Sequence, residues 1–332
     1  MKLALRFGAA ILVSLLAAPT AAQPSRCASY GFHRIEDEGR SLAGAARPIH
    51  FGLWLPSGCR GRWVTRRDLA RDSHVQTGET EAAITGVEQT GPALSAALDR
   101  PTGAVRAPAR LQPRRRPLVV YIHPTVVQAA PIAEALAREG FAVASFAWRG
   151  SFGQAFDVGI SGLISEMLDA QAIIRELVRR GIARERPIFV IGMSFGALTA
   201  LCLAQADPRV TALVSHDGGI TTPTGVRLSP LCPYFAAERP RAQALFLYDA
   251  SYAGTTWAVA DPLTRLRRRA LAIPVLEHRD YVGTVLLRAE ADPVMTDREA
   301  RVRNFRAMSA ATVAFLLCVR DRRPEGCDIS LP

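Results

Sequence analysis

The chain has 332 residues, of which 49% are hydrophobic and 21% are charged, a composition that excludes a disordered protein and predicts a sizeable buried core. Its net charge of +11 comes almost wholly from arginine, because Lys2 is the only lysine. The arginines are spread along the chain in runs of three at most, whereas nucleic-acid-binding proteins cluster their basic residues, so we expect no nucleic-acid partner.

The first 22 residues have the pattern of a secretory signal peptide. Lys2 and Arg6 precede an apolar stretch over residues 7–18, and Pro-Thr-Ala-Ala follows at 19–22, which predicts cleavage after Ala22. Beyond this segment no run of 18 apolar residues occurs, so we expect no transmembrane segment in the mature chain. We therefore predict a signal peptide over 1–22, one domain over 23–332, and export to the periplasm or the exterior.

Export changes the meaning of the six cysteines. An even number of cysteines in an oxidising compartment predicts disulfides, and the absence of any C-x-x-C spacing argues against a zinc or redox centre. Six cysteines allow 15 pairings. Proximity along the chain favours Cys27 with Cys59, Cys202 with Cys232, and Cys318 with Cys327.

The elements predicted in chain order begin with a half-buried strand over Pro48–Pro56. An irregular insert over 72–116 follows, partly helical over 93–100, and a second insert covers 223–241; we expect these two segments to form a lid that sets specificity. The regular elements are strands at 117–122, 141–147, 187–191, 210–215, 244–248 and 271–276, and helices at 129–139, 161–180, 195–206 and 300–319. Apolar strands that alternate with helices predict a mostly parallel sheet, with helices on both faces, in a single α/β domain.

A G-x-S-x-G motif, Gly192-Met193-Ser194-Phe195-Gly196, follows the strand at 187–191 and opens the helix at 195–206. This strand–turn–helix setting is typical of a nucleophile elbow. Gly192 and Gly196 allow the backbone to turn sharply, and the turn places the serine at the positive end of the helix. We predict that Ser194 is a nucleophile.

A serine hydroxyl needs a base to become a good nucleophile. In enzymes with this elbow the order along the chain is serine, acid, histidine, which leaves His216 and His278 as candidates. His278 follows the last predicted strand and is the predicted base, whereas His216 closes a strand and is expected to be structural. Asp217 and Asp249 each end a strand, and either could hold the histidine ring.

The oxyanion of a tetrahedral intermediate needs two backbone N–H donors. One is expected from Phe195, which follows the nucleophile, and the other from the loop after the strand at 117–122. Pro124 has no N–H, so Thr125 is the predicted second donor.

Together these motifs resemble the platelet-activating-factor acetylhydrolase and dienelactone-hydrolase-like branch of the α/β-hydrolases. The resemblance covers roughly residues 47–320, and the segments that carry it are Trp54-Leu55-Pro56, His123-Pro124-Thr125, the Ser194 elbow, Asp217-Gly218-Gly219 and His278-Arg279-Asp280-Tyr281. It implies an α/β-hydrolase fold and favours Asp217 over Asp249 as the acid. The family's His-Gly turn is His123-Pro124 here, and this departure narrows the choice of oxyanion donor.

The function implied is that of an exported serine hydrolase that cleaves small carboxylic esters, with no metal or organic cofactor. A peptidase or amidase with the same three residues is one alternative, although the sequence shows no identifiable peptide-binding segment. An inactive binding protein on the same fold is the other, and the presence of serine, acid and histidine in the expected order argues against it.

Overall fold

The computed structural model describes residues 26–42, 44–88, 91–107, 113–148, 159–221, 227, 229–234, 242–252, 268–322, 327 and 329. The predicted signal peptide and most of the predicted insert over 223–241 lie outside these ranges.

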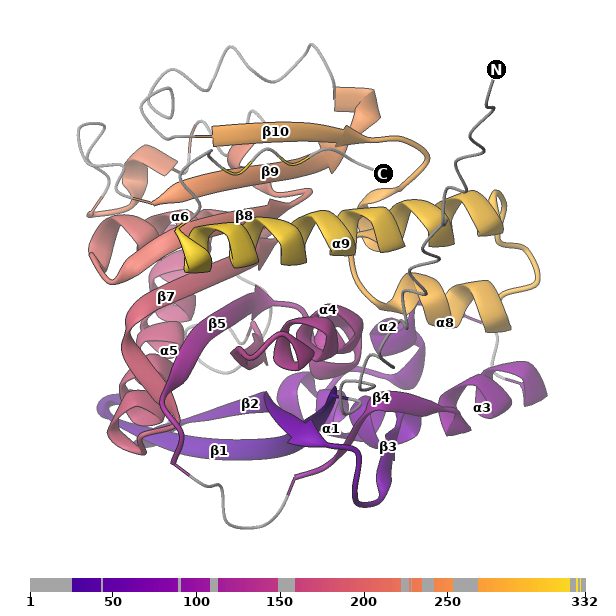
Figure 1. Cartoon of the computed structure of the whole chain (residues 1–332), viewed down its shortest axis with the longest axis horizontal. Helices are drawn as coiled ribbons and strands as arrows, with labels where there is room; N and C mark the ends of the chain where they lie inside the picture. Colours follow the sequence, from indigo (N-terminus) through magenta and orange to yellow (C-terminus); the bar gives the residue numbers. More distant parts are fainter. Residues whose placement is uncertain are drawn as a thin grey trace, which may run out of the picture.

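Within the described ranges, ten strands form one twisted sheet in the order β10-β9-β8-β7-β5-β6-β2-β1-β4-β3 (Figure 1). The strands are β1 (Arg26–Leu42), β2 (Ala45–Gly58), β3 (Trp63–Thr65), β4 (Pro101–Arg106), β5 (Arg116–His123), β6 (Ala142–Ala147), β7 (Ala183–Met193), β8 (Val210–His216), β9 (Gln243–Asp249) and β10 (Arg268–Ile273). The six strands from β10 to β6 are parallel to one another, and β2 joins them antiparallel to β6. The predicted mostly parallel sheet is confirmed.

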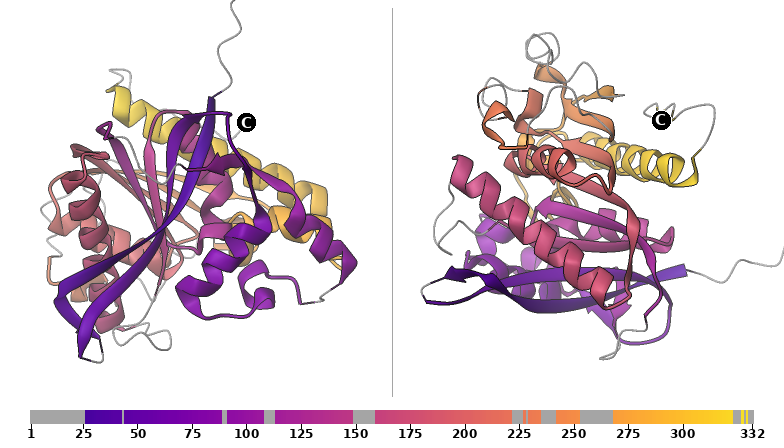
Figure 2. Two further views of the ribbon diagram at one scale, coloured as in Figure 1. Left: turned by 90° about the horizontal axis from the view of Figure 1, so that it is seen from below. Right: turned by 90° about the vertical axis from the view of Figure 1, so that its left-hand side faces the viewer.

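Helices cover both faces of this sheet (Figure 2). One face packs against α5 (Ile160–Arg179) and α6 (Phe195–Ala206). The other packs against α1 (Arg66–Thr77), α2 (Glu81–Thr85), α3 (Pro92–Asp99), α4 (Val126–Arg138), α8 (Thr284–Ala291) and α9 (Arg298–Asp321). Along β5, Val119 and Tyr121 are buried on the face that α4 covers, and Val120 and Ile122 are buried on the face that α5 and α6 cover. Because both faces are buried, the parallel strands are continuous apolar runs in the sequence.

Helix α9 is long and apolar enough, by length and composition alone, to cross a membrane. Its residues Phe305, Met308, Phe315 and Leu316 are buried in the core on the α4 side of the sheet. This packing is that of a core helix in a globular domain.

The N-terminal hairpin is the largest element that the sequence did not predict. β1 is a 17-residue strand, and β2 extends beyond the predicted Pro48–Pro56 at both ends. The two strands pair over most of their length and project past the body of the molecule (Figure 2). Residues 34–41 of β1 are exposed or half-buried and largely polar, so this part of the strand carries no hydrophobic alternation for a sequence pattern to detect.

The predicted insert over 72–116 is more regular than expected. The expected helix over 93–100 corresponds to α3, but α1, α2 and β4 were not predicted. In α1 the buried residues are Leu69, Ala70, Ser73 and Gln76. Because half of this buried face is polar, the helix has no apolar stripe in the sequence.

The structure contains three disulfides, Cys27–Cys59, Cys202–Cys232 and Cys318–Cys327, and all six cysteines are paired. The pairing expected from proximity along the chain is confirmed. Three disulfides in one domain are typical of proteins that fold outside the cytoplasm.

Protein that has been exported to an oxidising compartment should therefore contain no free thiol. We expect no reaction with a thiol reagent after denaturation without reductant, and six reactive thiols after reduction. Two or more reactive thiols before reduction would contradict the disulfide assignment.

Candidate active site

The predicted elbow lies where β7 ends and α6 begins. Ser194 has φ 54° and ψ −123°, a conformation that costs a non-glycine residue about 1–3 kcal/mol and occurs mainly at functional sites. A Cβ atom on Gly192 would lie 2.3 Å from the carbonyl oxygen of Gly196. The spacing of the two glycines thus allows β7 and α6 to approach closely, with the serine at the tip of the turn.

Three of the predicted residues meet at this turn. Nε2 of His278 lies 2.9 Å from Oγ of Ser194, and Nδ1 of His278 lies 2.6 Å from Oδ2 of Asp217. An ionised carboxylate can only accept a hydrogen bond, so Nδ1 carries the proton and Nε2 accepts from the serine hydroxyl. This is the arrangement by which an acid, a histidine and a serine activate the serine oxygen.

Asp217 is fixed by its surroundings. Its side chain is 6% exposed, and its second carboxylate oxygen accepts the backbone N–H of Asp249 at 3.1 Å. Its own backbone has φ 41°, and a Cβ atom on the following Gly218 would lie 2.2 Å from both Cβ of Ala197 and Oγ of Ser215. The Asp-Gly sequence therefore allows β8 to end close against the elbow.

The alternative acid, Asp249, is not among the hydrogen-bond partners of the His278 ring, which are Asp217 and Ser194. Its carboxylate accepts the N–H of Ser251 at 2.8 Å, and its backbone N–H supports Asp217. The structure thus brings Asp217, and not Asp249, to the histidine ring.

His216, the other candidate base, is fully buried. Tyr121 Oη lies 2.8 Å from its Nδ1, and Thr312 Oγ1 lies 2.9 Å from its Nε2. Burial lowers its pKa to about 3, so the ring is neutral near pH 7. It joins β5, β8 and α9 through hydrogen bonds, which is a structural role.

The two predicted oxyanion donors differ in their surroundings. Phe195 is the first residue of α6, directly after the serine. The N–H of Thr125 donates instead to Oε1 of Gln128 at 2.9 Å. Thr125 can serve as a donor to a substrate oxyanion only if this hydrogen bond is shared or released.

The first turn of α4 is also held by the insert, and the sequence did not predict this contact. The N–H of Val126 donates to Oε1 of Gln76 at 3.0 Å, and the N–H of Val127 donates to Oγ of Ser73 at 3.2 Å. The first N–H groups of a helix have no partner within the helix, and α1 supplies these partners. In the sequence, the only sign of this docking is that the polar residues Ser73 and Gln76 lie at helical spacing from the apolar residues Leu69 and Ala70.

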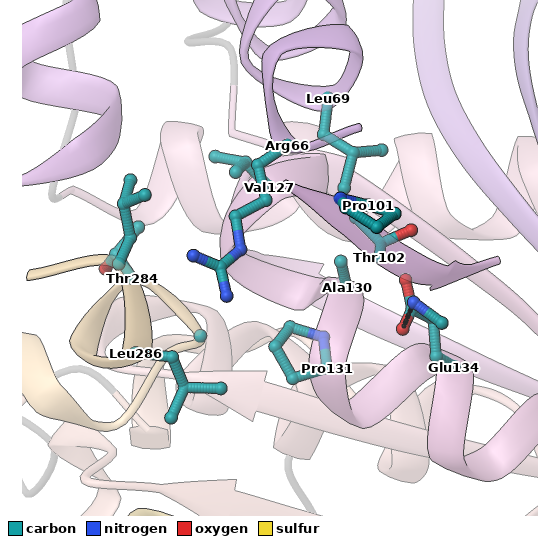
Figure 3. A pocket seen from close by; sticks show the side chains of 13 residues that line it. Arg66, Leu69, Pro101, Thr102, Val127, Ala130, Pro131, Glu134, Thr284 and Leu286 are labelled. Atoms are coloured by element: carbon teal, nitrogen blue, oxygen red, sulfur yellow. Dashed lines mark hydrogen bonds between the residues drawn. The ribbon is translucent and has the colours of Figure 1, made fainter. Parts of the chain in front are cut away.

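A separate cavity of about 190 Å³ lies between α1, β4, α4 and α8. Figure 3 shows the Arg66 side chain and the Glu134 carboxylate on opposite sides of it, with Pro131 and Ala130 between them. Oε2 of Glu134 accepts the N–H of Gly103 at 2.8 Å, and burial raises the pKa of this carboxyl group. None of Ser194, His278 and Asp217 lines this cavity.

Within the described ranges, no group of three or more His, Cys, Asp or Glu residues could hold a metal ion.

No protein-family model and no curated protein matches the chain, but many solved structures do. A ferulic acid esterase from Streptomyces cinnamoneus aligns with a TM-score of 0.63 and 20% identity, over 95% of this chain and 94% of the esterase. A dienelactone-hydrolase-like promiscuous phosphotriesterase from metagenomic libraries aligns with a TM-score of 0.45 and 15% identity, over 86% of this chain and 97% of the phosphotriesterase. A puromycin-hydrolysing peptidase of Mycobacterium tuberculosis aligns with a TM-score of 0.48 and 15% identity, over 84% of this chain and 38% of the peptidase.

The first of these alignments spans nearly the whole of both chains. Together with the strand order and the elbow, it shows that the protein has the α/β-hydrolase fold, as the sequence predicted.

Proposed function

We propose that the protein is a serine hydrolase of carboxylic esters that acts outside the cytoplasm. The observation that carries this proposal is the hydrogen-bonded line from Ser194 through His278 to Asp217, with heavy-atom distances of 2.9 and 2.6 Å. The resemblance of the sequence motifs to the platelet-activating-factor acetylhydrolase and dienelactone-hydrolase-like branch supports ester chemistry. The predicted leader and the three disulfides support export.

The reaction begins with attack of the Ser194 oxygen on the acyl carbonyl, while Nε2 of His278 takes the hydroxyl proton. Asp217 holds the ring and stabilises the imidazolium that forms. The oxyanion binds the N–H of Phe195 and, once its bond to Gln128 is shared or released, that of Thr125. His278 then gives the proton to the departing alcohol, and an acyl-serine remains.

Hydrolysis of the acyl-serine repeats these steps with water. Nε2 of His278 removes a proton from the water, the hydroxide adds to the acyl carbon, and the proton returns to Ser194 as the acid leaves. Each step uses only these side chains and backbone donors.

A peptidase or amidase would use the same residues, so the two activities must be separated by experiment. We expect hydrolysis of p-nitrophenyl esters with kcat/KM at least about a hundredfold higher than for the p-nitroanilide of the same acyl group, since the amide nitrogen must be protonated to leave. A series of acyl chain lengths measured on both leaving groups also defines the acyl preference. Faster cleavage of the anilides would favour the peptidase or amidase. Cleavage of neither series by folded protein would favour a binding protein.

A further inference from the structure

The base is carried by a short turn, and more than half of its side chain is exposed. His278–Asp280 forms a single helical turn between β10 and α8. The side chain of His278 is 54% exposed, and its ring is hydrogen-bonded to Ser194 and Asp217. The position of Nε2 therefore depends on where the backbone of the turn lies.

The turn is held on its buried side by Asp280, whose side chain is fully buried. Oδ2 of Asp280 accepts the backbone N–H of Glu277 at 3.0 Å, which closes the turn on the N-terminal side of the histidine. A buried carboxylate is retained only where charged or hydrogen-bonding partners compensate its loss of hydration.

Two arginines from different helices supply this compensation. Arg288 of α8 donates to Oδ1 of Asp280 at 2.7 Å, and Arg301 of α9 donates to Oδ2. Arg301 also donates to Oε1 of Glu277 at 2.5 Å and to the carbonyl of Thr296 at 3.1 Å. Both arginine side chains are less than a tenth exposed. The hydrogen bond from Arg301 holds the pKa of Glu277 below its usual range.

The C-terminal side of the turn is fixed as well. The N–H of Gly283 donates to the carbonyl of Gln128 in α4 at 2.7 Å. A Cβ atom on Gly283 would lie 2.4 Å from Cδ of Pro131, so only glycine allows this approach. The segment that carries His278 is thereby tied to α4, α8 and α9, and most of these ties pass through Asp280.

We propose that Asp280 is the positioning residue of the base, which it holds in line with Ser194 through the backbone of the turn, in partnership with Arg288 and Arg301. Asp217 orients the ring, and Asp280 fixes the point from which the ring extends. This inference rests on the proposed function, because it assigns a role in proton transfer between Ser194 and His278. A displacement of about 1 Å in such a group costs about a hundredfold in rate.

The test is Asp280→Asn, which removes the charge but keeps the shape. Its matched control is Asp169→Asn in a second buried cluster, where Asp169 accepts from Arg47 at 2.8 Å and from Arg40 at 2.6 Å. That cluster joins α5 to the N-terminal hairpin and contains none of the proposed catalytic residues. Both variants lose a buried carboxylate charge that faces two arginines, so both are expected to lower the melting temperature.

Assayed on an ester well below both melting temperatures, Asp280→Asn should lower kcat by about a hundredfold with KM within about threefold, since a displaced base impairs the chemical step more than substrate binding. Asp169→Asn should keep kcat within about twofold of wild type. A second readout is the far-downfield proton NMR signal of the His278 Nδ1–H. It should broaden or disappear in Asp280→Asn and persist in Asp169→Asn.

The double variant Asp280→Asn with Arg301→Gln separates positioning from stability. Removing both charges restores neutrality among Glu277, Asp280, Arg288 and Arg301, so the melting temperature should recover in part while kcat stays low. Recovery of kcat along with stability would overturn the proposal, as would equal losses in Asp280→Asn and Asp169→Asn.

Wild-type protein that neither hydrolyses esters nor reacts with a fluorophosphonate would refute the proposed function. The NMR comparison would still decide whether Asp280 positions His278. Retention of the Nδ1–H signal in Asp280→Asn would overturn that role.

Discussion

Ser194→Ala should lower ester turnover by a factor of about 10⁵ or more, because no other group can form the acyl-enzyme and the remaining residues then act only on water. Alanine keeps the Cβ atom at the φ of 54°, so the strain of the elbow is unchanged and the fold should be retained. Turnover measured on a short-chain p-nitrophenyl ester checks the loss. Covalent labelling by a fluorophosphonate should disappear in the same variant.

The matched control is Ser215→Ala. Ser215 lies on β8 and pairs with Gly192 of β7, so it is close to the elbow. It is buried, and among the described residues the hydrogen-bond partners of the His278 ring are Ser194 and Asp217. We expect full labelling of this variant. Labelling that persists in Ser194→Ala, or that is absent from the wild type, would refute the assignment of the nucleophile.

Asp217→Asn should lower turnover by on the order of 10³ or more. An amide that replaces the carboxylate can present its NH₂ group to Nδ1 of His278, which favours the tautomer with a proton on Nε2, and that tautomer cannot accept from Ser194. The corresponding change in a well-studied serine protease costs about 10⁴ in turnover. The measurement is kcat on the same ester, with thermal unfolding recorded to exclude loss of the fold.

Asp249→Asn is the comparison. Its contribution to the site is a backbone N–H to Asp217, which the substitution retains, so turnover should stay within about tenfold of wild type. A larger loss in Asp249→Asn than in Asp217→Asn would mean that the acid is Asp249 and that the hydrogen bonds described above misassign it.

The central part of the fold could be predicted because burial on both faces makes its strands apolar throughout. The predicted strand at 117–122 and the predicted helix at 195–206 differ from β5 and α6 by no more than one residue at either end. The N-terminal third could not be predicted in the same way. Residues 34–41 of its hairpin are exposed or half-buried and largely polar, and α1 buries polar side chains, so neither segment has the periodicity that distinguishes a strand from a helix.

The candidate site likewise has residues that the sequence pattern indicates and residues that only the structure reveals. The setting of Ser194 between a strand and a helix, and the chain order of the other residues, indicated His278, and the structure brings its Nε2 to 2.9 Å from Oγ of Ser194. Asp217 and Asp249 could not be separated by local pattern, since each follows a buried strand. The distinction is spatial: β8 lies next to β7, and β9 lies one strand further away. The roles of Gln76 and Ser73 were likewise invisible, because they depend on α1 docking against a helix about 50 residues away.

The contacts of α1 with α4 limit which segments of this fold can be exchanged without disturbing the proposed active site. Loops inserted around a hydrolase sheet are usually free to vary, and a change of specificity can then leave the catalytic machinery untouched. Here Gln76 and Ser73 of the insert accept the backbone N–H groups of Val126 and Val127, which directly follow Thr125. Exchange of the segment 66–77 for that of another protein with this fold should therefore displace the backbone next to Thr125, the proposed oxyanion donor, as well as change the surface. Changes to α1 and changes to the proposed oxyanion donor are therefore not independent in this protein.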